Sequence, residues 1–522
     1  MRKAVRDMLY SLSADTLVEV SNGTEAINAL SKNQFDIVLC DYNLGVGKNG
    51  QQVLEEARHR KLISYDCVFI IMSTEQTASM VLGAMDSKPD EYLTRPFNAQ
   101  QLHTRLQRQL QRKTYLQTVM SQMQRGDWIQ AIDNCDGLLA IGDKHMRSAL
   151  LKLRAELALQ VGDYEKAIEI YQQALTFREL NWARLGLGVV YYLQSHFDAA
   201  LSTFEQLVSE NPLYMEAYDW LTKTHEALNQ LTDAQQVLTQ AIQLSPQSIL
   251  RQKKLAQTAD KNGQFELAEA AYQAVVKLGK YSVHKSSSDF ANLAKLYSKT
   301  NAIQQALNIL DNMRQEFINN PEAELRAVTL ETTLHKLQGE EDLAQQAWQR
   351  MLTLAQQFES KVPKDLQLDV VQSCYLFDQS AQGDSLLADL IKAHLDDEPF
   401  LDDIRQVQSL LGRSQQCEKL IRQLKRSLIN INNQGVALYK QGNFEDAIAV
   451  FESAIATMPD NKTIVLNMLK IMIHELKIVE ITDDKIRRIE LLLKRAQQIG
   501  VDMQLLNLLQ VEFRKISQKV FL

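Results

Sequence analysis

A pattern that repeats along most of the chain limits the folds open to it. Several positions recur together with a period of about 34 residues. The clearest units are 181–214, 215–248, 249–282 and 428–461. Ala447 and Phe451 of the last unit, for example, match Ala200 and Phe204 of the first. Such a unit cannot bury its apolar side alone, so neighbouring units must stack into a superhelix with a continuous core and a concave groove. The pattern therefore predicts an all-α superhelix.

These units resemble tetratricopeptide repeats (TPRs), in which two helices cross closely at alanines and a glycine or polar turn separates them. Weaker copies occur at 112–145, 148–181, 287–320 and 325–358. The resemblance implies protein–protein binding, with an unidentified client protein in the groove. Residues of the helices that are expected to face this groove are Trp182, Asp219, Lys223 and Lys253.

Up to about residue 97 the chain follows a different pattern. Short β-type runs occur at 16–20, 35–40, 68–72 and 91–94, with room for one helix between neighbours. This alternation is typical of βαβ units, which form a parallel sheet covered by helices on both faces. After Pro96 the strand-type runs stop. The sequence thus predicts an α/β module ahead of the superhelix.

The two patterns meet in a segment without glycine or proline, from Phe97 to Arg125. Leu102, Leu106 and Leu110 recur at every fourth residue, as they do along one face of a helix. We predict a single long helix that leaves the α/β module and enters the repeats. It would be a stiff link, unlike a flexible Gly/Ser tether.

Markers in the α/β module resemble the receiver domain of two-component response regulators. Asp41 ends one predicted strand, Ser73 ends the next, and Arg95-Pro96 follows the last strand, which contains Tyr92. The resemblance implies a flavodoxin-like fold in which a histidine kinase or a phosphotransfer protein phosphorylates Asp41. It also implies that Ser73 binds the phosphoryl group and that Tyr92 is the switch aromatic. A carboxylate at the carboxyl end of a parallel strand lies where such sheets bind ligands and can attack phosphorus in line.

The α/β module departs from the family in two places. The family's first strand, with its pair of magnesium-binding acids, has no counterpart, because residues 1–6 align within the first helix. The resemblance implies Mg²⁺ at Asp41, yet without the acid pair this ion lacks its other carboxylate ligands. We expect the native open reading frame to begin about 20 residues upstream, enough for the missing strand and its loop. Arg95 replaces a lysine, and its planar guanidinium does not copy a lysine's point contact.

Composition argues against several classes of protein. The 57 basic and 64 acidic residues give a formal net charge of −7, which disfavours nonspecific binding to nucleic acid or anionic membranes. The five cysteines show no CxxC spacing, so neither a disulfide framework nor a zinc site is expected. There is no run of about 18 apolar residues, the length of a transmembrane helix. We expect a cytoplasmic protein without nucleic-acid or membrane partners. No catalytic motif is present, so an enzyme is not expected.

These patterns divide the chain into five parts. They are a receiver-like domain without its first strand at 1–111, a first set of repeats at 112–358, divergent helical repeats at 359–427, a further repeat at 428–461 and C-terminal capping helices at 462–522. The favoured function is a signalling adaptor in which phosphorylation of Asp41 controls the groove. One alternative is a scaffold whose pseudo-receiver docks without being phosphorylated. Another is a phosphatase that acts on a kinase or regulator.

Overall fold

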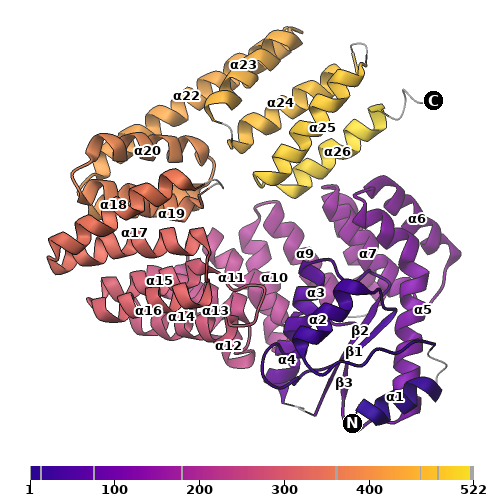
Figure 1. Ribbon diagram of the computed structural model, residues 1–522. Coiled ribbons are helices and arrows are strands. Elements are labelled where there is room, and N and C mark those ends of the chain that lie inside the picture. The colour runs from indigo at the N-terminus through magenta and orange to yellow at the C-terminus, as the bar shows by residue number, and fades with distance from the viewer. Residues whose placement is uncertain are drawn as a thin grey trace. The chain divides into compact units, whose positions relative to one another are not determined.

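A computed structural model (Figure 1) describes residues 2–11, 15–74, 77–177, 180–358, 362–458, 460–478 and 481–517. Its contacts divide the chain into two compact units. The first unit comprises Met1–Ala158 and Tyr164–Ala302. The second comprises Leu159–Asp163 and Ile303–Leu522.

The first unit begins with an α/β module. Its elements are α1 (Arg2–Ser11), α2 (Gly23–Lys32), β1 (Ile37–Asp41), α3 (Gly50–His59), β2 (Val68–Ser73), α4 (Ala78–Asp86), β3 (Glu91–Thr94) and α5 (Ala99–Gln124). The strands form a parallel sheet in the order β1-β2-β3. The central strand, β2, is buried along its whole length, which accounts for its uninterrupted apolar run.

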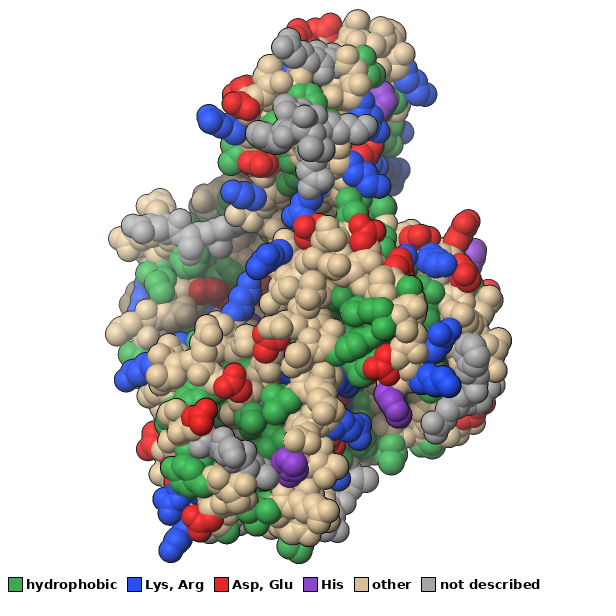
Figure 2. Space-filling view, turned by 90° about the vertical axis from the view of Figure 1, so that its right-hand side faces the viewer, with side chains coloured by type: hydrophobic (Ala, Val, Ile, Leu, Met, Phe, Trp, Pro, Cys, Tyr) green, Lys and Arg blue, Asp and Glu red, His purple; other side chains and the backbone are tan. Residues whose placement is uncertain are grey.

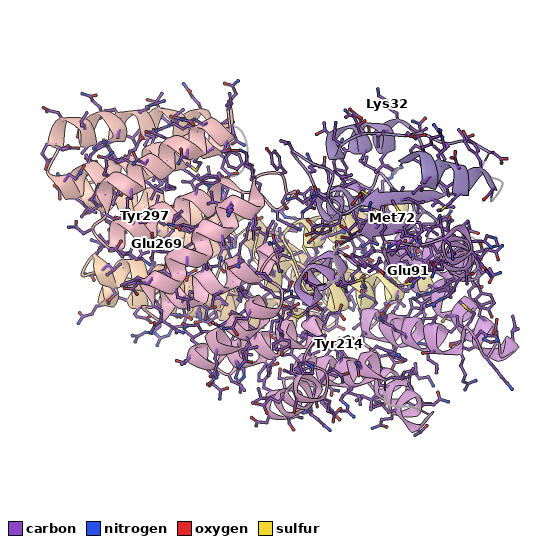
Figure 3. The ribbon with its side chains drawn as sticks, turned by 90° about the horizontal axis from the view of Figure 1, so that it is seen from below. Lys32, Met72, Glu91, Tyr214, Glu269 and Tyr297 are labelled. Atoms are coloured by element: carbon purple, nitrogen blue, oxygen red, sulfur yellow. The ribbon has the colours of Figure 1, made fainter. Side chains whose placement is uncertain are left out.

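Side chains of β2 alternate between two apolar cores. Phe69 and Ile71 pack with side chains of α2 and α3. Val68, Ile70 and Met72 point to the opposite face, where they pack with α1 and α5 (Figure 3 labels Met72). This alternation places helices on both faces of the sheet, as predicted.

The predicted strand at 16–20 is wrong, because these residues form neither a strand nor a helix. In the predicted strand order, the missing first strand would lie between 16–20 and β1. A run of residues becomes a strand only where it forms a hydrogen-bonded ladder with a neighbouring strand, and the local pattern at 16–20 does not contain this requirement. Among the described residues, β1 pairs with β2 alone.

Helix α5 confirms the long helix predicted between the two patterns, with 26 residues from Ala99 to Gln124. Lys113 is only 8% exposed and its Nζ lies 2.9 Å from Asp90 Oδ2, next to β3. The same ammonium group donates a hydrogen bond to the carbonyl oxygen of Cys67. One turn further, Leu116 belongs to the apolar core of α6 and α7. The boundary predicted after residue 111 thus falls inside one helix, which packs against the module and against the repeats.

After α5, the regular elements of the described residues are helices. They are α6 (Trp128–Ile141), α7 (Arg147–Gln160), α8 (Tyr164–Phe177), α9 (Asn181–Leu193), α10 (Phe197–Glu210), α11 (Met215–Ala227), α12 (Leu231–Leu244), α13 (Ile249–Lys261), α14 (Phe265–Gly279) and α15 (Ser287–Lys299). The three clearest predicted units of this region correspond to the pairs α9–α10, α11–α12 and α13–α14. Side-chain contacts also join neighbouring repeats. Tyr297 of α15 donates a hydrogen bond to Glu269 of α14 over 3.0 Å (Figure 3).

The turn inside each repeat contains a residue with positive φ. Gly162 and Gly263 have φ of 71° and 72°. Where the sequence has no glycine at this place, Ser195 and Asn229 adopt φ of 62° and 58°. A single left-handed residue ends the first helix and lets the chain reverse, and glycine does so without steric cost.

The second unit is also helical over the residues described. It contains α16 (Ile303–Glu316), α17 (Pro321–Gln338), α18 (Glu341–Gln357), α19 (Lys364–Leu376), α20 (Ser380–Ala393), α21 (Glu398–Leu410), α22 (Ser414–Lys440), α23 (Phe444–Thr457), α24 (Lys462–Glu475), α25 (Asp483–Gln498) and α26 (Met503–Ser517). Helix α22 crosses the boundary predicted at 427/428. The predicted C-terminal cap corresponds to α24, α25 and α26.

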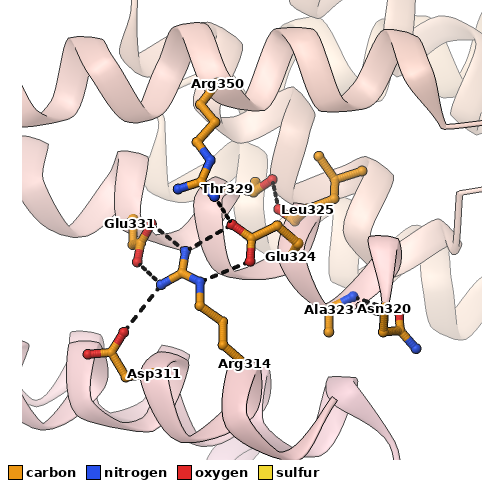
Figure 4. Close-up of polar contacts among 9 residues, drawn as sticks. All are labelled: Asp311, Arg314, Asn320, Ala323, Glu324, Leu325, Thr329, Glu331 and Arg350. Atoms are coloured by element: carbon orange, nitrogen blue, oxygen red, sulfur yellow. Dashed lines mark hydrogen bonds and ion pairs between the residues drawn. The ribbon is translucent and has the colours of Figure 1, made fainter. Parts of the chain in front are cut away.

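Arg314 connects helices of the second unit (Figure 4). From α16, its Nε lies 3.0 Å from Glu324 Oε2 and its Nη2 lies 2.8 Å from Glu331 Oε2, both on α17. Arg350 of α18 also reaches Glu324, at 2.6 Å. The hydrogen bonds to Glu331 raise the pKa of Arg314 although burial opposes the rise. The network therefore keeps the guanidinium charged where three helices meet.

The surface is mixed in character. Figure 2 shows one face, on which Lys and Arg side chains are interspersed with Asp and Glu side chains and with small hydrophobic areas. Within the described part of the chain, no helix combines the length and apolar character needed to cross a bilayer.

A glycine–aromatic contact sets the distance between the two helices of a repeat. A Cβ on Gly188 of α9 would lie 2.5 Å from Phe204 Cε1 of α10, and one on Gly435 of α22 would lie 2.3 Å from Phe451 Cε2 of α23. Both rings are fully buried. The aromatic ring thus occupies the space that a side chain at the glycine would need.

We predict that Gly188→Ala destabilises the first unit by about 1–3 kcal/mol, because the added methyl group overpacks a core that cannot yield. The matched control is Gly137→Ala in α6, where a Cβ meets nothing within 4 Å. That change should be neutral or stabilise by up to about 1 kcal/mol, because alanine favours helix. Urea unfolding followed by circular dichroism measures both, and equal midpoints for the two variants would contradict the prediction.

Candidate functional site

The carboxyl ends of the three strands bring the predicted phosphorylation-site residues to one edge of the sheet. Asp41 is the last residue of β1 and is paired in register with Met72 of β2. Ser73 ends β2, and the amide of Arg95 donates a hydrogen bond to its carbonyl oxygen over 2.8 Å. Tyr92 lies within β3 and packs at the edge of the core on the α2/α3 side. Parallel strands end at a common edge, so residues far apart in the sequence meet there.

Asp41 and Arg95 form an ion pair. Arg95 Nη2 lies 2.6 Å from Asp41 Oδ2, and the two side chains are 12% and 26% exposed. The other carboxylate oxygen accepts a hydrogen bond from the amide of Asn43 over 3.2 Å. Arg95 is joined to Pro96 by a cis peptide bond. A charge-assisted bond of this length, partly shielded from water, is stronger than one between neutral groups. The carboxylate is therefore held beside a positive charge.

Two neighbours of Asp41 restrict its surroundings further. Ser73 is only 3% exposed. Burial, and to a smaller extent the charge of Asp41, raises the pKa of the Cys40 thiol to about 12. This thiol therefore stays protonated near neutral pH and is not available as a nucleophile. The Asp41 side chain, at 26% exposed, is more accessible than the buried Cys40 thiol.

Gly50 is a site residue that sequence reasoning missed. Its amide donates a hydrogen bond to the carbonyl oxygen of Tyr42 over 2.8 Å, and a Cβ at this position would lie 2.4 Å from the carbonyl oxygen of Asp41. Only glycine allows α3 to begin so close to the end of β1. The available signal was a glycine at the end of the loop that follows Asp41.

The side chains around Asp41 do not fit the Mg²⁺ ion that the resemblance implies. Mg²⁺ prefers several oxygen ligands in octahedral geometry. Over the described ranges, no group of three or more His, Cys, Asp or Glu side chains is placed to hold a metal ion. Asp41 is instead paired with a guanidinium. No step proposed below depends on a metal.

The residues predicted to face the groove have different surroundings. Trp182 packs edge-on against Tyr171, with ring centroids 6.0 Å apart. Lys253 binds the Asp289 carboxylate at 2.9 Å and so supports the start of α15. On α11, Lys223 Nζ lies 4.2 Å from the centroid of the Trp220 ring. Each of these three side chains thus contacts a neighbour within the repeats, and their role in binding a client stays a prediction.

Asp219 leads to a second residue that sequence reasoning missed, Arg251 of α13. The guanidinium of Arg251 binds the Asp219 carboxylate through two hydrogen bonds of 2.7 and 2.9 Å. Arg251 is only 6% exposed and also binds Asp86 of the α/β module. Nothing in the local sequence marks it, because its partners come from other elements.

We predict that a double-mutant cycle with Asp41→Ala and Arg95→Ala gives a coupling of about 1.5–3 kcal/mol, the usual value for a partly buried hydrogen bond to a charged group. Native-state hydrogen exchange of the β1 and β2 amides measures the opening free energies. The exposed pair Lys166–Glu169 is the control, with an expected coupling below about 0.5 kcal/mol. A coupling at Asp41–Arg95 no larger than that of the control would show that the pair does not form in solution.

Comparison with known families agrees with this geometry. Residues 1–107 match the response regulator receiver domain family. Tetratricopeptide repeat families match residues 152–212, 185–249 and 431–461. A family described as pentatricopeptide repeat-containing protein matches residues 253–382.

Individual relatives cover one region each. The response regulator protein PmrA of Pseudomonas aeruginosa is 35% identical over 103 residues, which are 20% of this chain and 44% of PmrA, so the match spans less than half of that relative. A chemotaxis protein CheY homolog of Campylobacter jejuni is 28% identical over 108 residues, 20% of this chain and 82% of the homolog. Among solved structures, the C-terminal part of a TPR repeat-containing protein from Cytophaga hutchinsonii covers 46% of this chain and 95% of its own, with 12% identity and a TM-score of 0.38. The chain thus carries a response regulator receiver domain at residues 1–107, followed by tetratricopeptide repeats.

Proposed function

We propose that this chain is a non-enzymatic, cytoplasmic adaptor of a two-component pathway. In this proposal a histidine kinase or a phosphotransfer protein phosphorylates Asp41, and the receiver then changes which client protein the repeats bind. Neither nucleic acid nor a membrane is a partner. The observation that carries the proposal is the meeting of Asp41, Ser73 and Arg95 at the carboxyl edge of the sheet.

The chemistry needs an accessible carboxylate and a neighbouring positive charge. A carboxylate oxygen of Asp41 attacks the phosphorus of a phosphohistidine, the new P–O bond forms, and the P–N bond to the imidazole breaks. Arg95, which binds the free carboxylate at 2.6 Å, is close enough to turn to the phosphoryl oxygens and neutralise their added charge. The buried hydroxyl of Ser73 then serves as a hydrogen-bond donor to the same group.

The connection to the repeats supports a mechanical output. Helix α5 packs on the sheet through Leu102 and Leu106 and on the first repeat helices through Leu116 and Val119. A displacement of this helix at the receiver therefore changes its packing against α6 and α7 without an intervening flexible linker.

A second candidate function is a scaffold whose receiver docks without being phosphorylated. The Asp41–Arg95 ion pair favours it, because a carboxylate that is already neutralised by a guanidinium is a weaker nucleophile. The poor fit for Mg²⁺ favours it as well.

We expect the full-length chain to gain one phosphoryl group from acetyl phosphate, and the Asp41→Asn variant to gain none, because an amide cannot attack phosphorus. Intact-mass spectrometry, with and without MgCl₂, measures the adduct, and peptide mapping assigns it to Asp41. Ser73→Ala, which keeps the carboxylate, serves as the matched control and should be phosphorylated with an altered lifetime. If the unaltered chain acquires no adduct in either buffer, the scaffold is the better description.

A further inference from the structure

Helix α4 of the receiver lies against the repeats, beside α12 (Figure 1). Its last residue, Asp86, accepts a hydrogen bond from Arg251 Nη1 over 2.8 Å and one from Ser245 Oγ over 3.2 Å. Arg251 lies in α13, and its remaining nitrogens bind Asp219 of α11. One guanidinium therefore joins two repeats to the receiver.

Further contacts surround this pair. Leu82 of α4 packs against the apolar cluster of α10, α11 and α12, at whose edge Trp220 also lies. Lys88, just after α4, forms an ion pair with Glu216 of α11. We call the surface formed by Glu216, Asp219, Trp220 and Arg251 the α11/α13 face. Leu82 thus packs against apolar side chains, the acidic Asp86 binds the basic Arg251, and the basic Lys88 binds the acidic Glu216.

The contact is specific in charge but incompletely packed. A cavity of about 150 Å³ remains between α3 and α4 on one side and the α12–α13 turn on the other. Polar side chains such as Gln52, Glu55 and Gln247 line it together with the apolar Ile249, Leu250 and Leu278. Stable interfaces are packed as densely as protein interiors. The unfilled volume makes this contact less densely packed than a stable interface, as expected of two surfaces that can separate.

Helix α4 is also connected to the phosphorylation site. Ser73 ends β2, and α4 begins at Ala78. From the receiver side, Arg58 of α3 donates hydrogen bonds to the carbonyl oxygens of Ser87 and of Lys88, the latter over 2.7 Å. The end of α4 is therefore held between Arg58 of the receiver and Arg251 of the repeats.

We propose that α4 is an internal ligand of the α11/α13 face, and that it occupies the place of a client helix carrying a leucine-type residue and, one turn later, a carboxylate. The leucine position of the client takes the place of Leu82, and its carboxylate binds Arg251 as Asp86 does. This proposal rests on the proposed function in that it takes the repeats to bind a protein client, and it adds the chemistry of that client and the element that blocks it.

The physical basis is competition. A tethered ligand acts at an effective concentration of about millimolar, so a free helix with the same contacts cannot displace α4 unless α4 is released. Burial raises the pKa of Asp86, whereas Arg251 lowers it. Without the guanidinium, the carboxylate would be costly to keep in the contact. Arg251 is therefore the group on which internal and external ligands both depend.

The test uses the full-length chain and a fluorescein-labelled, lactam-stapled peptide of residues 77–90. The releasing variant combines Asp86→Ala with Lys88→Glu, which removes one ion pair and reverses the other without altering the repeats. The matched control combines Asp36→Ala with Lys32→Glu, an equal change of charge at exposed positions, Lys32 lying on α2 (Figure 3). Circular dichroism and exchange of the β2 amides verify that both variants fold.

Fluorescence anisotropy should show that the peptide binds the releasing variant at least about tenfold more tightly than the unaltered chain or the control, because the face is then free. Adding Arg251→Ala to the releasing variant, or Asp86→Ala to the peptide, should weaken binding by about tenfold or more, as expected for a lost charge-assisted hydrogen bond. The proposal would be overturned if the peptide bound equally to the unaltered chain and the releasing variant. It would also be overturned if removing Arg251 or the peptide's carboxylate left binding unchanged.

None of these measurements involves phosphate. A failure here therefore leaves the phosphorylation of Asp41 untouched, and a missing adduct at Asp41 leaves this contact untouched.

Discussion

The arrangement of the first unit depends on α5, because this helix belongs to two cores at once. Lys113 binds Asp90 and the carbonyl oxygen of Cys67 in the receiver, and one turn later Leu116 is buried among the first repeat helices. A buried ammonium needs such partners, since an unpaired charge would be expensive to desolvate. The overlap leaves no free hinge between the receiver and the repeats. The helix therefore fixes where the receiver can lie and makes the contact of α4 with α11 and α13 geometrically feasible.

The receiver is thus attached to the repeats in two different ways. The attachment through α5 is covalent and continuous, with apolar packing on both sides. Among the described side chains, the attachment through α4 involves two ion pairs and Leu82, beside an unfilled cavity. Contacts made by ion pairs around an unfilled cavity separate at lower cost than a packed apolar core. This difference makes α4 the element suited to a reversible change, with α5 as its permanent anchor.

The proposed phosphorylation site also combines two opposing properties. Asp41 and Ser73 end neighbouring strands at one edge of the sheet, and Arg95 neutralises the Asp41 carboxylate in the structure described. Lysine could release a carboxylate easily, whereas a planar guanidinium holds it with a directional bond. The same residue is therefore able to stabilise the free state and to bind an added phosphoryl group. If Arg95 mainly binds the added phosphoryl group, the receiver acts as a switch. If it mainly stabilises the free carboxylate, the receiver is part of a constitutive scaffold.

Local signals in the sequence determined the repeats, the long α5 and the buried central strand, because each depends on side chains near in sequence: matched alanines and aromatics, a stretch without glycine or proline, and an uninterrupted apolar run. The order of Asp41, Ser73 and Arg95 was also sufficient to place them together, since parallel strands share an edge. The strand predicted at 16–20 is wrong because a strand exists only through pairing with another strand, and a run of residues does not show which segments pair with it. Gly50 and Arg251 were missed for a related reason. Their roles come from backbone or side chains brought near by folding, and Arg251 meets Asp86 across 165 positions of sequence, a contact that only tertiary packing creates.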